Sequence, residues 1–356
     1  MTYLMEGLEA SDLYRKAREA SEMHWLTTRM GHRVPMVWLR RAKLDEKLRQ
    51  NEASDQALGR PLVLLHCHGN ATDIGMMMGP YYELGKVLGI EVCGVEYAGY
   101  GAAEGRPSSG NTYADVEAAY DYLVSNGVPP NRIVAYGQSV GSGPATALAS
   151  KKLLGGVVLH SPLLSGIKVV DPKPDVCCRP SCVWSCFDFY PNDRRIRQLL
   201  CPLFVMHGQR DDIIPFYHGF RLHKACPKQH RWPAYFPARA GHNDLVETDM
   251  RAYFGEVAHF LQDVRAIAEG NKVEPPTQSF EKPQQVQMVG PKSSSNFTEP
   301  REVEMAETST SAENQNPCPV KVGPEDGRYE EIRKGHLRVR LDLETNGAQA
   351  PARELR

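Results

Sequence analysis

The sequence predicts a doubly wound α/β domain, in which a mostly parallel sheet is covered by helices on both faces, followed by a polar tail. Between residues 23 and 268, short apolar runs alternate with segments whose apolar residues recur every three or four positions. Strands that alternate with helices build a parallel sheet that is buried on both faces. Beyond residue 269 the chain is rich in Pro, Ser, Gln and Glu, a composition that buries too little apolar surface to fold alone.

The expected strands are short apolar runs. They lie at residues 34–39, 61–66, 90–97, 132–136, 156–160, 202–207 and 232–236. Residues 23–28 and 34–39 flank Met30-Gly31-His32, which predicts an antiparallel hairpin that leads into the sheet.

Two helices are expected from their apolar spacing. The apolar face of residues 112–123 consists of Tyr113, Val116, Ala119, Tyr120 and Leu123. The apolar face of residues 243–261 consists of Leu245, Met250, Phe254, Val257 and Leu261.

We therefore expect three regions: an N-terminal extension (1–22), a folded catalytic domain (23–268) and a mainly disordered polar tail (269–356). Within the tail, residues 332–343 alternate apolar and polar side chains and favour a short strand if a partner edge is supplied.

Charge and composition exclude several classes of protein. The 356 residues carry 42 Lys and Arg against 43 Asp and Glu, a formal net charge of -1, so nucleic-acid binding is not expected as the main activity. The first fifteen residues contain no apolar run of signal-peptide length, and no 18-residue apolar stretch occurs. With nine cysteines and no secretory signal, we expect a cytoplasmic protein with reduced thiols.

The sharpest motif is Gly137-Gln138-Ser139-Val140-Gly141. A strand-like run precedes it and a run of small, helix-compatible residues follows, which is the setting of a nucleophile elbow. The two flanking glycines allow a tight turn that exposes the Ser139 hydroxyl. The alternative is an ordinary strand-to-helix turn.

A serine hydroxyl needs a base and an orienting acid, which this motif predicts in the chain order Ser, Asp, His. Asp211 follows an expected strand and is our choice of acid, with Asp212 as the fallback. His242 lies between the last expected strand and the final helix, and we take it as the base. The alternatives are a solvated loop acid and a helix-capping histidine.

Two backbone N–H groups should stabilise the oxyanion. One belongs to Val140, directly after the nucleophile, and the other to Asn70 or Ala71 in the turn after the second expected strand. Gly69 would let the backbone of that turn approach the substrate. A second loop, residues 96–101, is interpreted as a structural corner beside the site, with a lining role in an acyl pocket as the alternative.

No metal or other cofactor is expected. His66 and His68 share one face of a strand, but no third ligand follows at a suitable spacing. Four further cysteines, Cys177, Cys178, Cys182 and Cys186, lie near Trp184 and Phe187. We interpret them as reduced thiols in a lid loop; zinc binding and S-acylation with membrane contact are the alternatives.

Together these motifs resemble one known family over about two-thirds of the chain, residues 31–261. The motifs are His68-Gly69-Asn70-Ala71, Tyr97-x-Gly-Tyr-Gly, Tyr113-Ala-Asp-x-Glu-Ala-Ala, Tyr136-Gly-Gln-Ser-x-Gly, His160-Ser-Pro-Leu-x-Ser-Gly, Cys186-Phe-Asp-x-x-Pro-Asn and Gly241-His-Asn-Asp. They resemble those of the alpha/beta hydrolase domain-containing protein 17 family, serine hydrolases that remove palmitate from cysteine thioesters of membrane-associated proteins.

The resemblance implies an α/β-hydrolase fold with Ser139, Asp211 and His242 at the family's triad positions. It also implies S-acylated proteins as substrates and, as an addition to a cytoplasmic location, peripheral contact with the cytosolic face of membranes. Animal members carry an acylated N-terminal cysteine cluster. The first cysteine here is Cys67, so we expect that anchor to be missing or replaced. The alternatives are a carboxylesterase or monoacylglycerol-type lipase with the same triad, and a non-catalytic interaction protein of the same fold.

Overall fold

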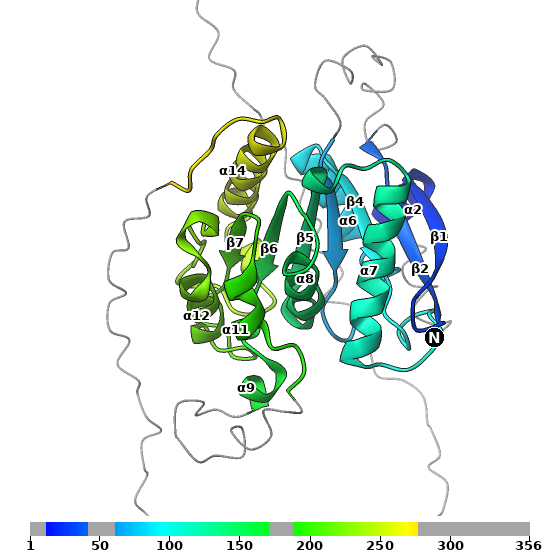
Figure 1. Cartoon of the computed structure of the whole chain (residues 1–356), viewed down its shortest axis with the longest axis horizontal. Helices are drawn as coiled ribbons and strands as arrows, with labels where there is room; N and C mark the ends of the chain where they lie inside the picture. Colours follow the sequence, from blue (N-terminus) through cyan, green and yellow to red (C-terminus); the bar gives the residue numbers. More distant parts are fainter. Residues whose placement is uncertain (1–11, 42–60, 171–187, 277–356) are drawn as a thin grey trace, which may run out of the picture. The chain divides into compact units, whose positions relative to one another are not determined.

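A seven-stranded sheet forms the centre of the fold, with the strand order β1-β2-β4-β3-β5-β6-β7 (Figure 1). The strands are β1 (Ser21–Thr27), β2 (Arg33–Leu39), β3 (Val63–Cys67), β4 (Glu91–Val95), β5 (Ile133–Gln138), β6 (Gly156–His160) and β7 (Leu203–Met206). The strands β4, β3, β5, β6 and β7 pair in parallel, whereas β1 with β2 and β2 with β4 are antiparallel. The predicted mostly parallel sheet with an N-terminal antiparallel pair is confirmed.

This computed structural model describes residues 12–41, 61–170 and 188–276, all within one of the two compact units of the chain. The tail beyond residue 276, including the alternating stretch 332–343, lies outside the described residues, as do the four cysteines at positions 177–186. No helix in the described ranges is long and apolar enough to cross a membrane.

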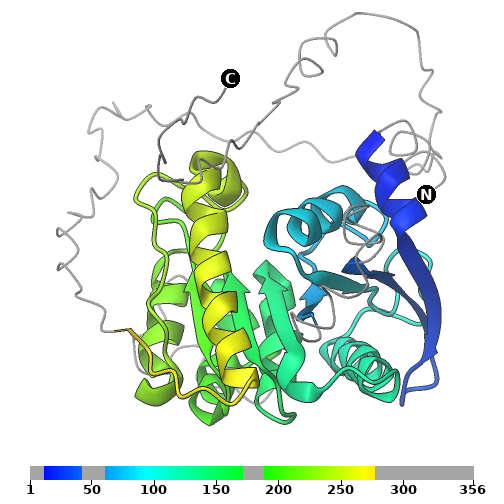
Figure 2. The same ribbon diagram turned by 90° about the horizontal axis from the view of Figure 1, so that it is seen from above.

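Helices cover both faces of the sheet, and Figure 2 shows α6 (Met78–Leu88) and α7 (Ser109–Ser125) on opposite sides of it. The other described α-helices are α2 (Asp12–Ala20), α8 (Ser142–Ala149), α9 (Gly166–Val170), α11 (Asn192–Arg195), α12 (Tyr217–Ala225), α13 (Leu245–Thr248) and α14 (Met250–Ala268). Short 3-10 turns occur at η1 (Pro130–Arg132), η2 (Ser139–Gly141), η4 (Ile196–Gln198) and η5 (Lys228–His230).

The strands are apolar on both faces because each face has its own core. In β3, Val63 and Leu65 pack with α7 and α8, whereas Leu64 packs with α6 and α14. Successive side chains of a strand point to opposite faces, so a strand buried on both sides reads as a continuous apolar run. This arrangement leaves polar side chains to gather where the strands end.

The N-terminal hairpin forms in the predicted place. Thr27 pairs with Arg33 at its closed end and Ser21 with Leu39 at its open end. Gly31 adopts a φ of 81°, which glycine reaches without a Cβ clash, and its N–H donates to the Thr28 carbonyl oxygen at 2.9 Å. The helix α2, inside the predicted N-terminal extension, precedes this hairpin and packs on α6.

Two predicted elements differ from the structure. Residues 232–236 run beside β7 but form only isolated bridges, Leu203 with Arg231 and Met206 with Tyr235, because Pro233 and Pro237 have no N–H to donate. The expected helix over residues 243–261 is divided at Asp249, whose φ of -155° and ψ of 84° are extended. The Asp249 carboxylate caps α14 by accepting from the Ala252 N–H at 2.9 Å.

The inner face of α7 carries a buried carboxyl group, Asp115. Its Oδ2 accepts from the Ala98 N–H at 2.8 Å, while Oδ1 has no hydrogen-bond partner among the described residues. Burial raises the pKa of Asp115 to about 7, and the neighbouring charge of Glu96 adds to the rise against the hydrogen bond from Ala98. A carboxyl group with a raised pKa favours the protonated form in the folded state.

This raised pKa predicts how stability depends on pH. Between the ordinary carboxyl pKa near 4 and about 7, the folded state binds more protons at Asp115 than the unfolded state, so stability falls as pH rises. Asp115→Asn keeps an acceptor for Ala98 and removes this dependence. We expect the Tm advantage of Asp115→Asn over wild type to grow from pH 4 to pH 7 and then to level off. Asp121→Asn, on the exposed side of α7, is the control, and pH curves that run parallel for wild type and Asp115→Asn would refute this interpretation.

Candidate active site

Ser139 lies on a sharp turn between β5 and α8, at the carboxyl edge of the sheet. Its φ of 53° falls in the left-handed region, which a non-glycine residue adopts at a cost. The flanking glycines permit this turn: a Cβ on Gly137 would lie 2.7 Å from the Gly141 carbonyl oxygen, and a Cβ on Gly141 would lie 2.1 Å from that of Cys67. The geometry is that of a nucleophile elbow.

The structure brings Ser139, His242 and Asp211 together in one hydrogen-bonded chain. His242 Nε2 lies 3.1 Å from Ser139 Oγ, and His242 Nδ1 lies 2.7 Å from Asp211 Oδ2. The three side chains come from separate segments that follow β5, β7 and the extended stretch 231–237. The fallback acid, Asp212, is exposed, and His242 Nδ1 donates to Asp211 instead.

Asp211 is held as a carboxylate by a cage of donors. Its Oδ1 accepts from the N–H groups of Ile213 at 3.0 Å and Ile214 at 2.7 Å. Its Oδ2 lies 3.1 Å from Nε2 of the buried His207. Burial alone would raise the pKa of Asp211, but the hydrogen bonds from His207, His242 and Ile214 outweigh it and hold that pKa well below its ordinary value.

A charged Asp211 fixes the tautomer of His242. The carboxylate only accepts hydrogen bonds, so Nδ1 of His242 must carry the proton between them. Nε2 is then an acceptor directed at the Ser139 hydroxyl, which is the arrangement a general base requires. Sequence reasoning missed His207, the second histidine that contacts Asp211. Its position four residues before Asp211, at the end of β7, was the available signal.

Two buried histidines near Ser139, His242 and Asp211, namely His160 and His218, remain uncharged. Burial, followed by the charges of His242 and His207, lowers the pKa of His160 to about 3. Burial and the charge of His207 lower the pKa of His218 to about 4. His160 Nδ1 lies 2.7 Å from the Tyr136 hydroxyl, and His218 Nδ1 accepts from the Leu164 N–H at 3.0 Å. Both rings therefore act as neutral supports at neutral pH.

The loop after β3 lies against the elbow, where the predicted oxyanion donors should be. A Cβ on Gly69 would lie 3.8 Å from the Ser139 Cβ, which puts the backbone of this loop beside the nucleophile. Asn70 and Ala71 are exposed, and Ala71 has a left-handed φ of 56°. Val140 follows Ser139 in η2. The donor roles of the Val140, Asn70 and Ala71 N–H groups stay predictions.

The loop at residues 96–101 holds the loop after β3 in place. The Tyr97 hydroxyl donates to the His68 carbonyl oxygen at 2.9 Å, and the Tyr100 hydroxyl donates to Asn70 Oδ1 at 2.8 Å. The buried Glu96 lies 2.9 Å from His68 Nε2 through Oε1 and accepts from the Ile74 N–H at 3.0 Å through Oε2. Sequence reasoning expected a structural corner here, and the hydrogen bonds identify what it supports.

His66 and His68, considered above as a metal pair, each stack on a different tyrosine. His66 stacks on Tyr136 with ring centroids 4.6 Å apart, whereas His68 stacks on Tyr97 at 4.2 Å. Burial lowers the pKa of His66 well below its ordinary value, and the neighbouring His68 and His160 rings add to the fall. Within the described part of the chain, no group of three His, Cys, Asp or Glu side chains is placed to hold a metal ion.

An apolar cluster adjoins the nucleophile. Leu163, Tyr190 and Ile214 are buried together, and Val140 packs against them. The Tyr190 ring also fills the space beside Gly143, where a Cβ would lie 2.2 Å from it. This cluster gives the site an apolar side next to the Ser139 hydroxyl.

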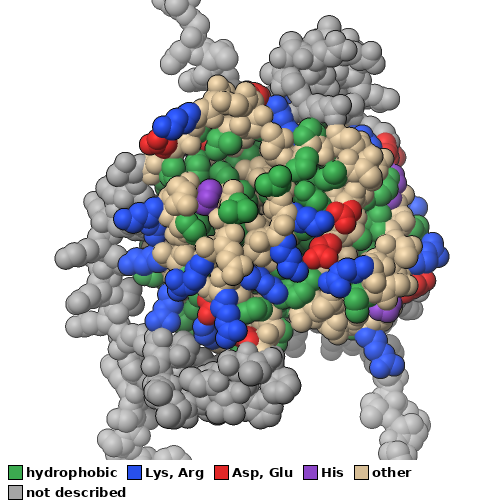
Figure 3. Space-filling model, in the orientation of Figure 1, with side chains coloured by type: hydrophobic (Ala, Val, Ile, Leu, Met, Phe, Trp, Pro, Cys, Tyr) green, Lys and Arg blue, Asp and Glu red, His purple; other side chains and the backbone are tan. Residues whose placement is uncertain are grey.

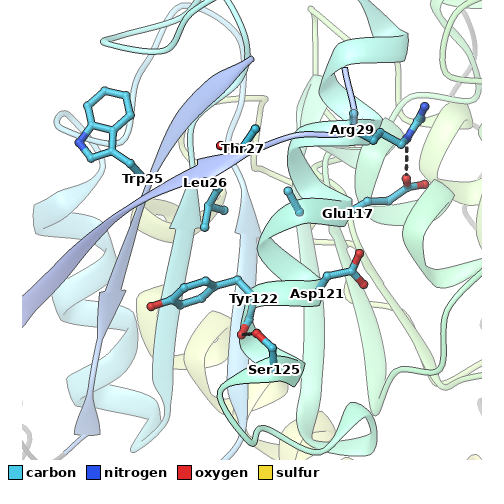
Figure 4. Close-up of a pocket in the computed structure, with 10 residues that line it drawn as sticks. Trp25, Leu26, Thr27, Arg29, Glu117, Asp121, Tyr122 and Ser125 are labelled. Atoms are coloured by element: carbon cyan, nitrogen blue, oxygen red, sulfur yellow. Dashed lines mark hydrogen bonds and ion pairs between the residues drawn. The ribbon is translucent and has the colours of Figure 1, made fainter. Parts of the chain in front are cut away.

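A hollow of about 500 Å³ between β1 and α7 is separate from these residues (Figure 4). It is lined by the backbone and side chains of Leu26, Thr27 and Tyr122 among others, and an ion pair of Arg29 Nε with Glu117 Oε2 at 3.0 Å crosses its rim. Neither Ser139, His242 nor Asp211 lines it. We therefore assign it no part in the candidate site.

Comparison with known proteins agrees with the motifs. The chain is 42% identical over 206 residues to alpha/beta hydrolase domain-containing protein aho-3 of Caenorhabditis elegans, which covers 58% of each protein. It is 39% identical over 183 residues to human alpha/beta hydrolase domain-containing protein 17C, covering 51% of this chain and 53% of that protein. Over about half of its length, the chain is similar to the alpha/beta hydrolase domain-containing protein 17 proteins. It spans little more than half the length of these curated relatives, and no protein-family model matches it.

Solved structures confirm the α/β-hydrolase fold. An esterase from Pyrococcus furiosus is 18% identical with a TM-score of 0.52, over 68% of this chain and 91% of that one. The 2,6-dihydroxy-pseudo-oxynicotine hydrolase is 16% identical with a TM-score of 0.55, over 74% of each chain. At these identities the likeness concerns the fold alone.

Tyr97 supports the loop after β3, so we expect its loss to lower kcat without a matching fall in stability. Tyr97→Phe removes the hydrogen bond to the His68 carbonyl oxygen, and we expect kcat for an activated ester to fall about fivefold, the equivalent of one hydrogen bond. Tyr120→Phe is the matched control, because its hydroxyl bonds the Leu153 carbonyl oxygen in another part of the fold. Steady-state kinetics and Tm should be measured for both. Equal effects of the two variants on kcat would contradict the positioning role.

Proposed function

We propose that the chain is a serine hydrolase that cleaves long-chain acyl thioesters through an acyl-enzyme on Ser139. The observation that supports it most is the chain of hydrogen bonds from Ser139 Oγ through His242 to the charged Asp211. A hydroxyl is a weak nucleophile, and an adjacent neutral imidazole with a fixed tautomer is the common means of activating it. The α/β-hydrolase fold places these residues at the edge where its members carry out catalysis.

In the first half of the reaction, His242 Nε2 accepts the Ser139 proton while Ser139 Oγ attacks the acyl carbonyl carbon. The carbonyl oxygen becomes an oxyanion, held by the Val140 N–H and by that of Asn70 or Ala71. The imidazolium is stabilised by Asp211. Collapse of this intermediate breaks the carbon–sulfur bond and leaves the acyl group on Ser139, with the sulfur taking the proton from His242.

In the second half, His242 takes a proton from water, and the resulting hydroxide attacks the acyl-Ser139 carbonyl carbon. Collapse returns the proton to Ser139 Oγ and releases the fatty acid. The cysteine sulfur is a good leaving group, so the reaction requires no cofactor or metal ion. Ser139 and His242 are thus used twice, while the charge on Asp211 is constant.

Two further features support the proposed acyl group and protein substrate. The buried side chains of Leu163, Tyr190 and Ile214 pack against Val140, which directly follows the nucleophile, so the surroundings of Ser139 are apolar on this side. The family resemblance points to S-palmitoyl cysteines of membrane-associated proteins, which would be met at the cytosolic face of membranes from a cytoplasmic location. The alternatives are a carboxylesterase or monoacylglycerol-type lipase with the same triad, and a non-catalytic interaction protein; the intact hydrogen-bonded chain favours an enzyme.

The proposal predicts hydrolysis of an S-palmitoyl-cysteine peptide that depends on Ser139. We expect Ser139→Ala to lower its turnover by about four orders of magnitude or more, because triad members act as a unit. Release of palmitate should be measured with purified wild type and Ser139→Ala, from this peptide and from a matched O-palmitoyl-serine peptide.

Each outcome separates the alternatives. Turnover of the oxyester alone would favour the esterase or lipase and reject the thioesterase. Activity of Ser139→Ala near that of wild type would reject the nucleophile. The proposal predicts that a fluorophosphonate probe labels wild type and not Ser139→Ala. A probe that labels neither wild type nor Ser139→Ala would favour a non-catalytic interaction protein.

A further inference from the structure

A basic hollow of about 390 Å³ lies between α9, α11, η4 and α12. Four cationic side chains line it, Lys168 of α9, Arg197 of η4, and Arg221 and Lys224 of α12, together with Leu164 and a single acidic side chain, Asp193. In Figure 3, Lys and Arg side chains gather over α11 and α12, at the lower left of the face shown. We call this hollow the basic pocket.

Local contacts hold these cations in the basic pocket. Lys168 pairs with Asp193. The Arg221 guanidinium lies 5.8 Å from the Tyr217 ring centroid, and the Lys224 ammonium lies 4.6 Å from that of Phe220. The four cations exceed the one acid that lines the hollow, in a chain whose formal net charge is -1. The positive charge is therefore a local accumulation, which attracts anions to this place.

Exposed apolar side chains adjoin the basic pocket. Val170, 79% exposed, lies on α9 two residues after Lys168. Phe189, 44% exposed, packs its ring where a Cβ on Gly166 of α9 would lie 2.1 Å away. Cations that line a hollow, beside exposed apolar side chains, match a surface that is anionic outside and hydrocarbon inside.

The same segment connects to the nucleophile. Tyr190, next to Phe189, fills the space beside Gly143 in α8, the helix that follows the Ser139 turn. Leu164 of the basic pocket follows Leu163, whose N–H donates to the Ser142 hydroxyl at 3.3 Å. Tyr190 and Leu163 thus connect the segments that carry Phe189 and Leu164 to α8, the helix that follows the Ser139 turn.

We propose that the basic pocket, with Val170 and Phe189, docks the chain on an anionic phospholipid bilayer, the pocket holding a lipid phosphate. The inference rests on the proposed function, since docking through the basic pocket, Val170 and Phe189 would bring Ser139 to acyl chains at the membrane surface. A bilayer fits these residues better than a soluble anion because a soluble anion gives no role to the exposed Val170 and Phe189.

Vesicle binding tests the proposal without any turnover. The full chain carrying Ser139→Ala should sediment with vesicles that contain phosphatidylserine and bind phosphatidylcholine vesicles much more weakly. Adding Arg197→Gln and Lys224→Gln should weaken binding about 25-fold, at about fivefold for each basic residue removed. The control adds Lys86→Gln and Arg251→Gln, which remove two exposed cations on α6 and α14 across the sheet, and should leave binding unchanged.

The remaining outcomes overturn the docking surface or set it apart from catalysis. Equal loss in both double variants, equal binding to both vesicle types, or no binding would reject it. A Tm increase with inorganic phosphate that requires Arg197 and Lys224, without vesicle binding, would assign the pocket to a soluble ion and also reject it. With Ser139 intact, Arg197→Gln/Lys224→Gln should hydrolyse a soluble ester as wild type does, and Tm should show that it folds. Vesicle binding by a protein that hydrolyses no acyl substrate would reject the proposed function alone.

Discussion

The hydrogen bond between the buried Asp211 carboxylate and His242 is the interaction on which the candidate site depends. Two backbone N–H groups and His207 keep the carboxylate charged despite its burial, and the charge orients His242 toward Ser139. Without those donors, burial would favour a protonated acid that could no longer fix the imidazole. The turn after β7 thus stabilises the charged form of Asp211, which the proposed activation of the Ser139 hydroxyl by His242 requires.

Close backbone contact joins the other half of the site. Gly141 lies so near the carbonyl oxygens of Cys67 and His68 that a side chain there would displace the loop after β3. The same loop is tied from its other side by Tyr97 and Glu96. Nucleophile and predicted oxyanion donors are therefore parts of one packed unit, with little freedom to move separately, which is what stabilisation of a developing charge requires.

Much of this arrangement could be predicted from the sequence, because it follows from local patterns. Short apolar runs that alternate with helical segments predict the sheet, and the glycines around Ser139 predict the elbow. The separation of α13 from α14 at Asp249 and the loss of a regular strand at residues 232–236 depend on single backbone groups, which periodicity does not register. Glu96 was missed as a support because its contacts with His68 and Ile74 join two loops that only the folded chain brings together. His207 was missed although it lies four residues before Asp211, because a histidine at that spacing is not by itself a signal for support of a carboxylate.

In the proposed reaction an acyl group passes through Ser139. To detect it, the protein is mixed with a palmitoyl thioester and quenched with acid during turnover, and any adduct is located by peptide mass spectrometry. We expect one palmitoyl group on the peptide that contains Ser139, absent from Ser139→Ala. Turnover with no adduct on Ser139, or with the acyl group on a cysteine instead, would rule out Ser139 as the nucleophile.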